Sequence, residues 1–264
     1  MAYTTTYPLD CSPHRILDLD ADAHGHYLAL LSNAEVWTPT WRLALPNTFK
    51  QPLIRELDEE RFLIVEAHRP TALNGHIFAT TGHKLASFEA GDGIEEVLIQ
   101  AGRIVIAYFD EGVVAGKLPG RDGLAVFDFT GQQLFGFNAS YPDAILDCYC
   151  MCRQGRDSIV AYTYPDFPLW TIRLTDFCVS KQATPADFAG AAVLTTYQEG
   201  LLFYSSYADK TSFFWWDRKA RVHRLPSTAQ ALRGIGNGHF LIYAAASFTI
   251  LAAGELVKQT LGRD

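Results

Sequence analysis

Acidic side chains gather in four short segments between residues 91 and 169, each containing an aromatic residue or a glycine. The segments are residues 91–96, 108–112, 147–149 and 164–169. Their carboxylates are Asp92, Glu95, Glu96, Asp110, Glu111, Asp147 and Asp166. Carboxylate oxygens bind hard divalent cations and cationic groups, but Asp also caps turns by accepting hydrogen bonds from nearby amides. These segments therefore predict either a ligand site or a set of turn caps.

Aromatic residues occupy three of the same segments and add a second kind of binding group to the carboxylates. Aromatic rings attract cations through their faces and supply apolar contact with few rotamers to restrict. Rings and carboxylates together suit a cationic or hydrogen-bond-donating group. The predicted ligand-binding residues are Asp92, Tyr108, Asp110, Glu111, Asp147, Tyr149, Tyr164, Asp166 and Phe167.

The elements that would position these residues are short apolar runs, each followed by a strand, a polar turn and a second strand. The runs are marked by Tyr27, Phe62, Ile104, Ile159, Leu202 and Phe240, and clear hairpin patterns cover residues 77–85, 126–134, 214–222 and 248–256. A repeat of about 40 to 50 residues with four strands per unit is typical of a β-propeller. A β-sandwich would not explain two patterns that recur in a fixed order.

We therefore predict an all-β chain that forms a single domain over residues 1–264. Six four-stranded blades begin near residues 14, 52, 91, 143, 190 and 230, and no stretch shows helical periodicity. Residues 3–7 are expected to pair with the last blade and close the ring, which removes two exposed sheet edges.

In a propeller each blade runs from an inner strand a to an outer strand d. The b–c and d–a connections share one face, which we call the b–c face. By this count all four acidic and aromatic segments fall on the b–c face of blades 3 and 4. The connection over residues 110–123 is the longest, and loops of that length are often functional.

The four segments also carry a family resemblance. The motifs Gly-Asp-Gly-Ile at residues 91–94, Tyr-Phe-Asp-Glu-Gly at 108–112, Asp-Cys-Tyr at 147–149 and Tyr-x-Asp-Phe-Pro-Leu at 164–169 resemble those of a group of bacterial six-bladed propeller-like proteins. The resemblance covers roughly residues 75–175. It implies the fold and carries no reaction with it.

The composition and charge of the chain exclude some classes of binding partner. The chain has 264 residues, of which 48% are hydrophobic and 13% aromatic, and its net charge is −7. No basic stripe is present, so nucleic acid is not an expected partner, whereas a basic protein or a small cationic ligand is. No apolar run is long enough to span a bilayer, so no membrane partner is expected. Without an export signal near residue 1, five cysteines indicate reduced thiols and a cytoplasmic location.

The leading hypothesis is a non-enzymatic binding protein without a cofactor. The alternative is a divalent-metal-dependent hydrolase, with Ca²⁺ or a similar cation at the channel mouth. Six-bladed lactonases of the gluconolactonase and paraoxonase kind are similar in plan, and Glu, Asn and Asp hold their metal. Here the asparagines lie outside the acidic segments, at Asn33, Asn47, Asn74, Asn138 and Asn237. Serine-nucleophile, phosphate-loop, His-Glu-x-x-His and Cys-x-x-Cys motifs are absent.

Three other groups of residues have structural explanations. Cys148, Cys150 and Cys152 alternate along a predicted strand, which would place them on one face but too far apart to share one zinc ion. We expect them to be small core residues. His24 and His26 fall in an a–b turn on the opposite face, without a third ligand nearby. The tryptophans, which are Trp37, Trp41, Trp170, Trp215 and Trp216, are expected to pack between blades.

Overall fold

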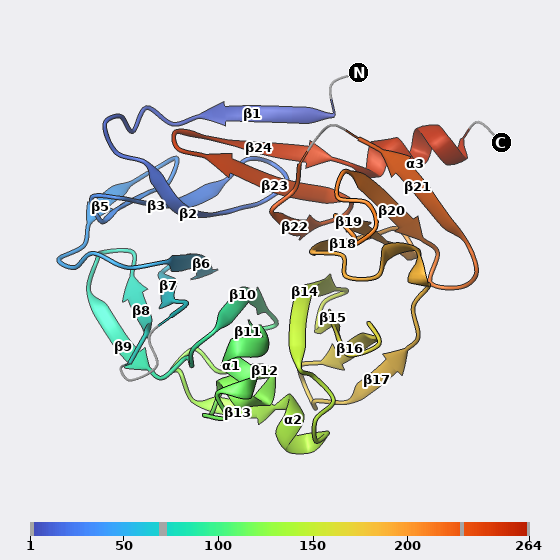
Figure 1. Ribbon diagram of the computed structural model, residues 1–264. Coiled ribbons are helices and arrows are strands. Elements are labelled where there is room, and N and C mark those ends of the chain that lie inside the picture. Colours follow the sequence, from blue (N-terminus) through green and yellow to red (C-terminus); the bar gives the residue numbers. More distant parts are fainter. Residues whose placement is uncertain (1–2, 69–72, 228–229, 263–264) are drawn as a thin grey trace.

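The computed structural model describes residues 3–68, 73–227 and 230–262, which form six four-stranded antiparallel sheets around one axis (Figure 1). The chain is a six-bladed β-propeller, as the repeat predicts. Strands β2, β6, β10, β14, β18 and β22 line the axis as strand a of blades 1 to 6.

The strands follow one another from a to d in blades 1 to 5. Blade 1 is β2 (Ile16–Ala21), β3 (Tyr27–Leu31), β4 (Glu35–Trp37) and β5 (Arg42–Ala44). Blade 2 is β6 (Pro52–Asp58), β7 (Arg61–Glu66), β8 (Gly75–Ala79) and β9 (Lys84–Phe88). Blade 3 is β10 (Ile94–Gln100), β11 (Arg103–Tyr108), β12 (Leu124–Phe127) and β13 (Gln133–Gly136). Blade 4 is β14 (Asp147–Gln154), β15 (Ser158–Tyr164), β16 (Leu169–Arg173) and β17 (Val179–Gln182). Blade 5 is β18 (Val193–Tyr197), β19 (Gly200–Tyr204), β20 (Ser212–Trp216) and β21 (Val222–Pro226).

Blade 6 is assembled from both ends of the chain. Its strands a, b and c are β22 (Arg233–Gly236), β23 (His239–Ala244) and β24 (Ser247–Ala252), and its strand d is β1 (Thr4–Pro8). The pairing of β1 with β24 is antiparallel, from Thr4 opposite Leu251 to Pro8 opposite Ser247. The expected closure of the ring by the N-terminal strand is therefore confirmed.

The predicted hairpin over residues 248–256 is wrong in its second half. After β24 the chain forms the helix α3 (Gly254–Leu261), because β1 already pairs with the edge of β24 that a second strand would need. Val257 is buried on this helix, and Leu256 and Leu261 pack beside it against blade 5 and blade 6. In the described part of the chain no helix has both the length and the apolar character needed to cross a membrane.

The core lies between neighbouring blades rather than inside any one of them. Because each blade is covered on both faces, its middle strands are mostly apolar, and every residue of β19 is buried. Large rings fill the space that widens toward the rim. Trp37, Trp170, Trp215 and Trp216 are buried, and Trp41 packs on Phe62, so core packing explains the tryptophans as expected.

Candidate functional site

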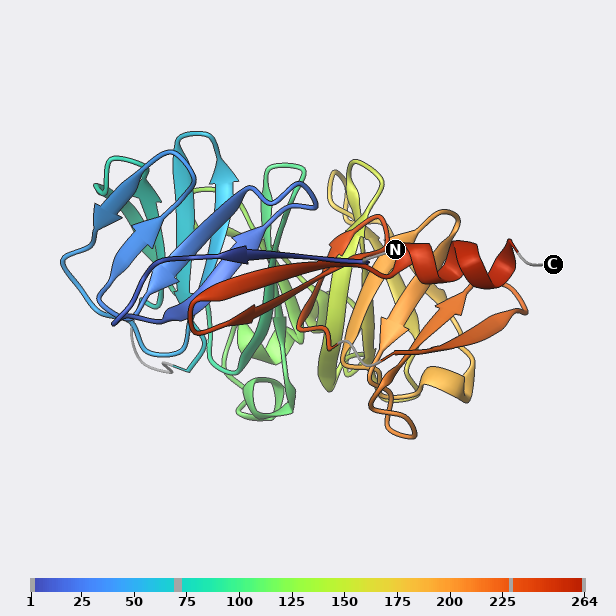
Figure 2. The same cartoon turned by 90° about the horizontal axis from the view of Figure 1, so that it is seen from above.

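The four acidic and aromatic segments lie on the b–c face of blades 3 and 4, as predicted. The connection from β11 to β12 contains the short helix α1 (Asp110–Val114) and the 3-10 turn η1 (Gly120–Asp122). In the edge-on view of Figure 2 this green connection projects from the lower side of the ring. The connection is packed against the blades, because Val113 is buried and α1 contacts β11 and β14.

Two glycines bring the segments of blade 3 into backbone contact. Gly93 has a φ of 67°, and a Cβ placed on it would lie 2.5 Å from the backbone nitrogen of Gly112. The amide of Phe109 donates a hydrogen bond of 3.0 Å to the Gly93 carbonyl. Only glycine fits so close a crossing in this left-handed conformation. The crossing holds the connection that carries Asp92 against the start of α1. It therefore fixes the position of Asp110, the first residue of α1.

Asp147, at the start of β14, lies close to two other carboxylates. Burial, together with the negative charges of Asp110 and Glu95, raises its pKa from 3.8 to about 7. The Asp147 carboxylate has no hydrogen bond or ion pair with any described residue. Desolvation in the channel mouth and the charge of Glu96 also raise the pKa of Glu95. We call Glu95, Asp110 and Asp147 the acidic cluster; none of the three carboxylates forms an ion pair with another residue that the structure describes.

Beside the acidic cluster, Phe167 is at the centre of a group of tyrosines. Its ring centroid lies 5.3 Å from that of Tyr149, 5.8 Å from Tyr164 and 5.6 Å from Tyr207. The hydroxyls of Tyr149 and Tyr207 are hydrogen-bonded to each other. Burial, this hydrogen bond and nearby carboxylates raise the pKa of Tyr149. We call Tyr149, Tyr164, Phe167 and Tyr207 the aromatic cluster.

The loop that presents Phe167 has an unusual backbone. Asp166 and Phe167 have φ values of 64° and 51°, a left-handed conformation that side chains other than glycine seldom adopt. The Thr184 hydroxyl donates a 2.6 Å hydrogen bond to the Phe167 carbonyl and helps to hold it. Such conformations persist where the surroundings enforce them, often at binding sites. The loop therefore holds the Phe167 ring in one position against its neighbours.

The structure does not bring every predicted residue into this group. Tyr108 is fully buried, and its hydroxyl donates a 2.6 Å hydrogen bond to the Ala90 carbonyl, so its ring is not available to a ligand on the surface. Asp92 lies 3.8 Å from the Nδ1 atom of His68. Glu111 and Asp166 are exposed, and neither carboxylate contacts the acidic cluster within the described chain.

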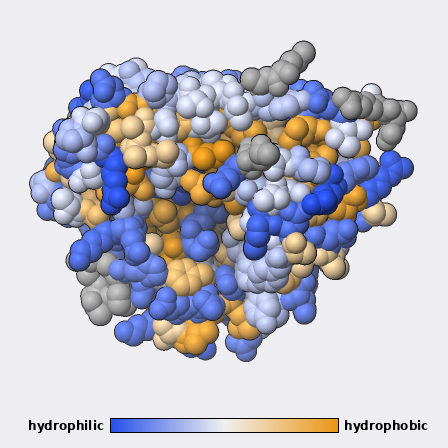
Figure 3. Space-filling view, turned by 45° about the horizontal axis from the view of Figure 1, so that its top comes forward, coloured by the Kyte–Doolittle hydropathy of each residue, from blue (hydrophilic) through white to orange (hydrophobic). Residues whose placement is uncertain are grey.

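One residue of each cluster, Glu95 and Tyr149, lines a cavity of about 220 Å³ in the mouth of the central channel. Glu95, Tyr149 and Leu232 line it near the b–c face, while Glu96, Arg55 and Arg233 line it deeper along the axis. Figure 3 shows apolar and hydrophilic residues interspersed around the hollow of the ring on this side. A ligand in the cavity would touch Glu95 of the acidic cluster and Tyr149 of the aromatic cluster.

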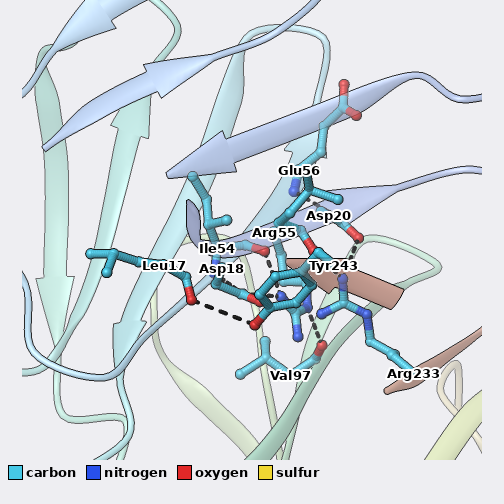
Figure 4. Close-up of polar contacts among 10 residues, drawn as sticks. Leu17, Asp18, Asp20, Ile54, Arg55, Glu56, Val97, Arg233 and Tyr243 are labelled. Atoms are coloured by element: carbon cyan, nitrogen blue, oxygen red, sulfur yellow. Dashed lines mark hydrogen bonds and ion pairs between the residues drawn. The ribbon is translucent and has the colours of Figure 1, made fainter. Parts of the chain in front are cut away.

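Charged residues that are buried or half-buried contact one another between the inner strands (Figure 4). Asp18 of blade 1 accepts a 2.7 Å hydrogen bond from the Arg55 guanidinium of blade 2, and both side chains are buried. The Arg55 Nε atom donates to the Val97 carbonyl of blade 3 at 2.6 Å. Arg233 of blade 6 lies 3.6 Å from Asp20. These contacts join four blades, and we call the set of Asp18, Asp20, Arg55 and Arg233 the axial network.

Electrostatics within the axial network favour pairing. Burial disfavours the charged form of Arg55, but Asp18, Asp20 and Glu96 outweigh it and raise its pKa. Burial and repulsion by Arg55 lower the pKa of Arg233, against the attraction of the same carboxylates. Sequence reasoning missed this network. The available signal was the presence of charged residues in inner strands, two in Ile16–Ala21 and three in Pro52–Asp58.

Tyr207 was also missed, although its place in the repeat could have identified it. It follows strand b of blade 5, just as Phe167 follows strand b of blade 4. Aligning the b–c connections of successive blades would have paired the two positions.

The three alternating cysteines do not share one face, which corrects the prediction. A β-bulge between Cys148 and Cys150 shifts the register of β14 against β15. Cys148 therefore packs with Met151 toward blade 3, whereas Cys150 and Cys152 pack toward blade 5. All three are buried free thiols, as expected of core residues.

Within the described residues, no three His, Cys, Asp or Glu side chains are arranged to hold a metal ion. His24 and His26 lie in the turn between β2 and β3, on the face opposite the acidic cluster, where the Nδ1 atom of His26 is 3.0 Å from Asp22.

The fold and the site thus define a six-bladed β-propeller with an acidic and aromatic cavity at one mouth of its channel. No protein-family model matches the chain, and no curated protein matches it by sequence. Solved structures match the chain in fold. Virginiamycin B lyase from Staphylococcus aureus aligns with a TM-score of 0.53 and 11% identity over 94% of this chain and 98% of that one. A catalytically inactive H270A form of that lyase, with quinupristin, gives 0.51 and 10% over the same shares.

A second similar protein is Hsv2 from Kluyveromyces lactis. It aligns with a TM-score of 0.54 and 11% identity over 80% of this chain and 64% of that one. At these identities the likeness concerns the fold alone, and function has to be argued from the site.

Proposed function

We propose that this propeller is a binding protein that holds a cationic group in the cavity at the b–c mouth of its channel. The observation that carries the proposal is the grouping of three carboxylates in the acidic cluster, where burial and the charges of Asp110 and Glu95 raise the pKa of Asp147 to about 7. A guanidinium or ammonium group would relieve the repulsion among Glu95, Asp110 and Asp147. An opposite charge within about 4–6 Å favours ionised carboxylates, so binding and ionisation of Asp147 reinforce each other.

The aromatic cluster supports the same ligand. Tyr149 lines the cavity, and Phe167 and Tyr207 pack against it. A cation close to an aromatic face gains about 0.5–2 kcal/mol, more when water is excluded. The alternative raised by the sequence, a metal-dependent hydrolase, gains no support from the described residues because no metal-binding group converges among them.

The proposal is tested by titrating n-butylguanidinium into the full chain and following binding by NMR or calorimetry. We expect a dissociation constant on the order of 1 mM, which is reasonable for so small a ligand. Affinity should rise about tenfold between about pH 5.5 and pH 8.5, as Asp147 loses its proton. Uncharged n-pentanol should not bind.

Two variants complete the test. Asp147→Asn should weaken n-butylguanidinium binding about tenfold. Glu60→Gln, which removes one exposed negative charge from the turn between β6 and β7 on the opposite face, should leave it unchanged. Equal binding by the parent and Asp147→Asn, or an affinity independent of pH, would refute the proposal.

A further inference from the structure

Most of the large apolar side chains that the described chain exposes lie on the b–c face. They are Leu73, Val114, Leu118, Tyr141, Leu146, Tyr164, Tyr207 and Leu232. All belong to b–c or d–a connections or to the last residue of a strand b. The exceptions are Leu85 and Leu134, on the outer strands of blades 2 and 3. Exposed apolar residues gathered on one face mark interaction sites, whereas scattered ones need no explanation.

Most of these residues lie outside the lining of the cavity. Leu232 lines it, and Tyr164 and Tyr207 contact Phe167 beside it. The amide of Leu146 bonds to the Tyr164 carbonyl at 2.9 Å, so Leu146 continues the patch toward blade 3. Val114 is 78% exposed and does not line the cavity. A ligand confined to the cavity would therefore leave much of this apolar surface in water.

The charge of the same face is mainly negative. Its connections in blades 3 and 4 carry two basic residues, Lys117 and Arg121, against more acidic ones. The acidic residues are Glu89, Asp92, Asp110, Glu111, Asp143 and Asp166, and the buried Asp122. Glu95 adds negative charge to the cavity lining, where together with Asp18 and Glu96 it outnumbers Arg55 and Arg233, and Asp147 lies near Glu95. A partner that carries positive charge would be attracted to this face.

We infer that the b–c face docks a protein that inserts one lysine or arginine side chain into the cavity and covers the exposed apolar residues around it. This inference rests on the proposed cation site and names what delivers the cation. The cavity, at about 220 Å³, is smaller than the roughly 300–1,000 Å³ of pockets that enclose whole small ligands. It is of a size for a single side chain, which is how a central anchor in a protein interface is seated.

The surface is already organised for docking. The Asn138 side chain donates to the carbonyls of Arg121 and Ile145 at 3.0 and 2.7 Å, and its oxygen accepts from the Ile145 amide at 3.0 Å. It thereby ties the b–c connection of blade 3 to the chain entering blade 4. Little ordering is required of this side when a partner binds, which favours affinity.

The test begins with a selection from a phage-displayed library of random peptides against the full chain. We expect enriched peptides to contain Lys or Arg flanked by aromatic or aliphatic residues. A synthetic copy of an enriched peptide should bind at least about tenfold more tightly than n-butylguanidinium.

Substitution at the edge of the face then separates the partner from the cation site. Val114→Ser combined with Leu118→Ser should weaken the peptide about tenfold and leave n-butylguanidinium binding unchanged. Leu85→Ser, an exposed leucine on the outer strand of blade 2, is the matched control and should change neither. Asp147→Asn should weaken both ligands.

The outcomes distinguish the two proposals. If n-butylguanidinium binds but no peptide is enriched, or if enriched peptides ignore the Val114 and Leu118 substitutions, the site takes a small ligand and the docking inference is wrong. Enriched peptides without a basic residue would also overturn it. If n-butylguanidinium does not bind at all, the proposed cation site itself fails.

Discussion

The carboxylates of Asp110 and Asp147 repel each other across the boundary between blades 3 and 4, and no basic side chain in the described chain is paired with Asp147. A protein that keeps like charges together gives up stability at that place. The arrangement is therefore expected to serve binding rather than folding, and the two roles predict opposite effects of mutation.

Asp147→Asn should stabilise the protein at neutral and alkaline pH. The folded-state pKa of Asp147 is about 7, above the ordinary 3.8, so its contribution to stability is complete below about pH 4 and is lost as the pH rises through about 7. The asparagine variant avoids that loss. Asp147 is half-buried and screened by solvent, so we expect a gain of about 1 kcal/mol at about pH 8 and no gain at about pH 4.

Urea denaturation at both pH values measures this effect. Glu60→Gln serves as the control for removal of one negative charge. A loss of stability in Asp147→Asn at about pH 8 would show that the carboxylate supports the fold.

The pair Asp110→Asn with Asp166→Asn tests the loops on either side of the boundary. If the carboxylates bind the ligand, n-butylguanidinium binding should fall while the melting temperature stays nearly unchanged. If they cap the loops, the double variant should melt early, since such losses cost about 1 kcal/mol each. Because only Asp110 belongs to the acidic cluster, Asp166→Asn alone should have the smaller effect on binding. A stable double variant with full binding would remove both residues from the site.

The axial network gives a third prediction. Arg55→Met leaves the Asp18 carboxylate buried without its partner, which should cost about 3–5 kcal/mol of unfolding free energy. Asp18→Leu together with Arg55→Met removes both charges and should recover most of that loss. Denaturation of the two variants and the parent tests this. If the single and double variants are equally destabilised, pairing is not the reason for the loss.

The cysteines give the fourth prediction. Cys178 is exposed, and the other four cysteines are buried, with burial first among the causes that raise the pKa values of Cys148, Cys150 and Cys152. A thiol reagent should therefore label Cys178 quickly and the others only on unfolding, and Cys178→Ser should abolish the rapid phase.

Cys150→Ala should act as a core truncation, with a loss of about 1 kcal/mol and unchanged n-butylguanidinium binding. Stoichiometric zinc in the parent that is lost from Cys150→Ala would contradict the assignment of a core thiol.

Some secondary-structure elements could be predicted from the sequence, and others could not. Middle strands such as β19 are buried on both faces and read as apolar runs, so the blades could be counted in advance. The helix α3 spans only eight residues, too few for a clear period, and it forms because β1 occupies the neighbouring sheet edge. The bulge at Cys148 depends on the pairing of β14 with β15, which alternation along one strand cannot reveal.

Some features of the site could likewise be predicted from the sequence, and others could not. Placing Asp110 and Asp147 on one face needed only the order of strands in a blade. The burial of Tyr108 and the contact of Tyr149 with Tyr207 depend on how neighbouring blades pack. The pairing of Asp18 with Arg55 depends on the curvature of the ring. None of these follows from residue types.

The pairing of β1 with β24 also orders events during synthesis. Thr4–Pro8 leave the ribosome before any blade exists, yet their hydrogen-bonding partners are made only when residues 247–251 emerge. Until then the nascent chain carries an unpaired strand at one end and an incomplete row of blades at the other, both open to pairing with a neighbouring chain. The ring therefore closes only after residues 247–251 have been translated, and a pause before residue 247 would hold the protein in an aggregation-prone form.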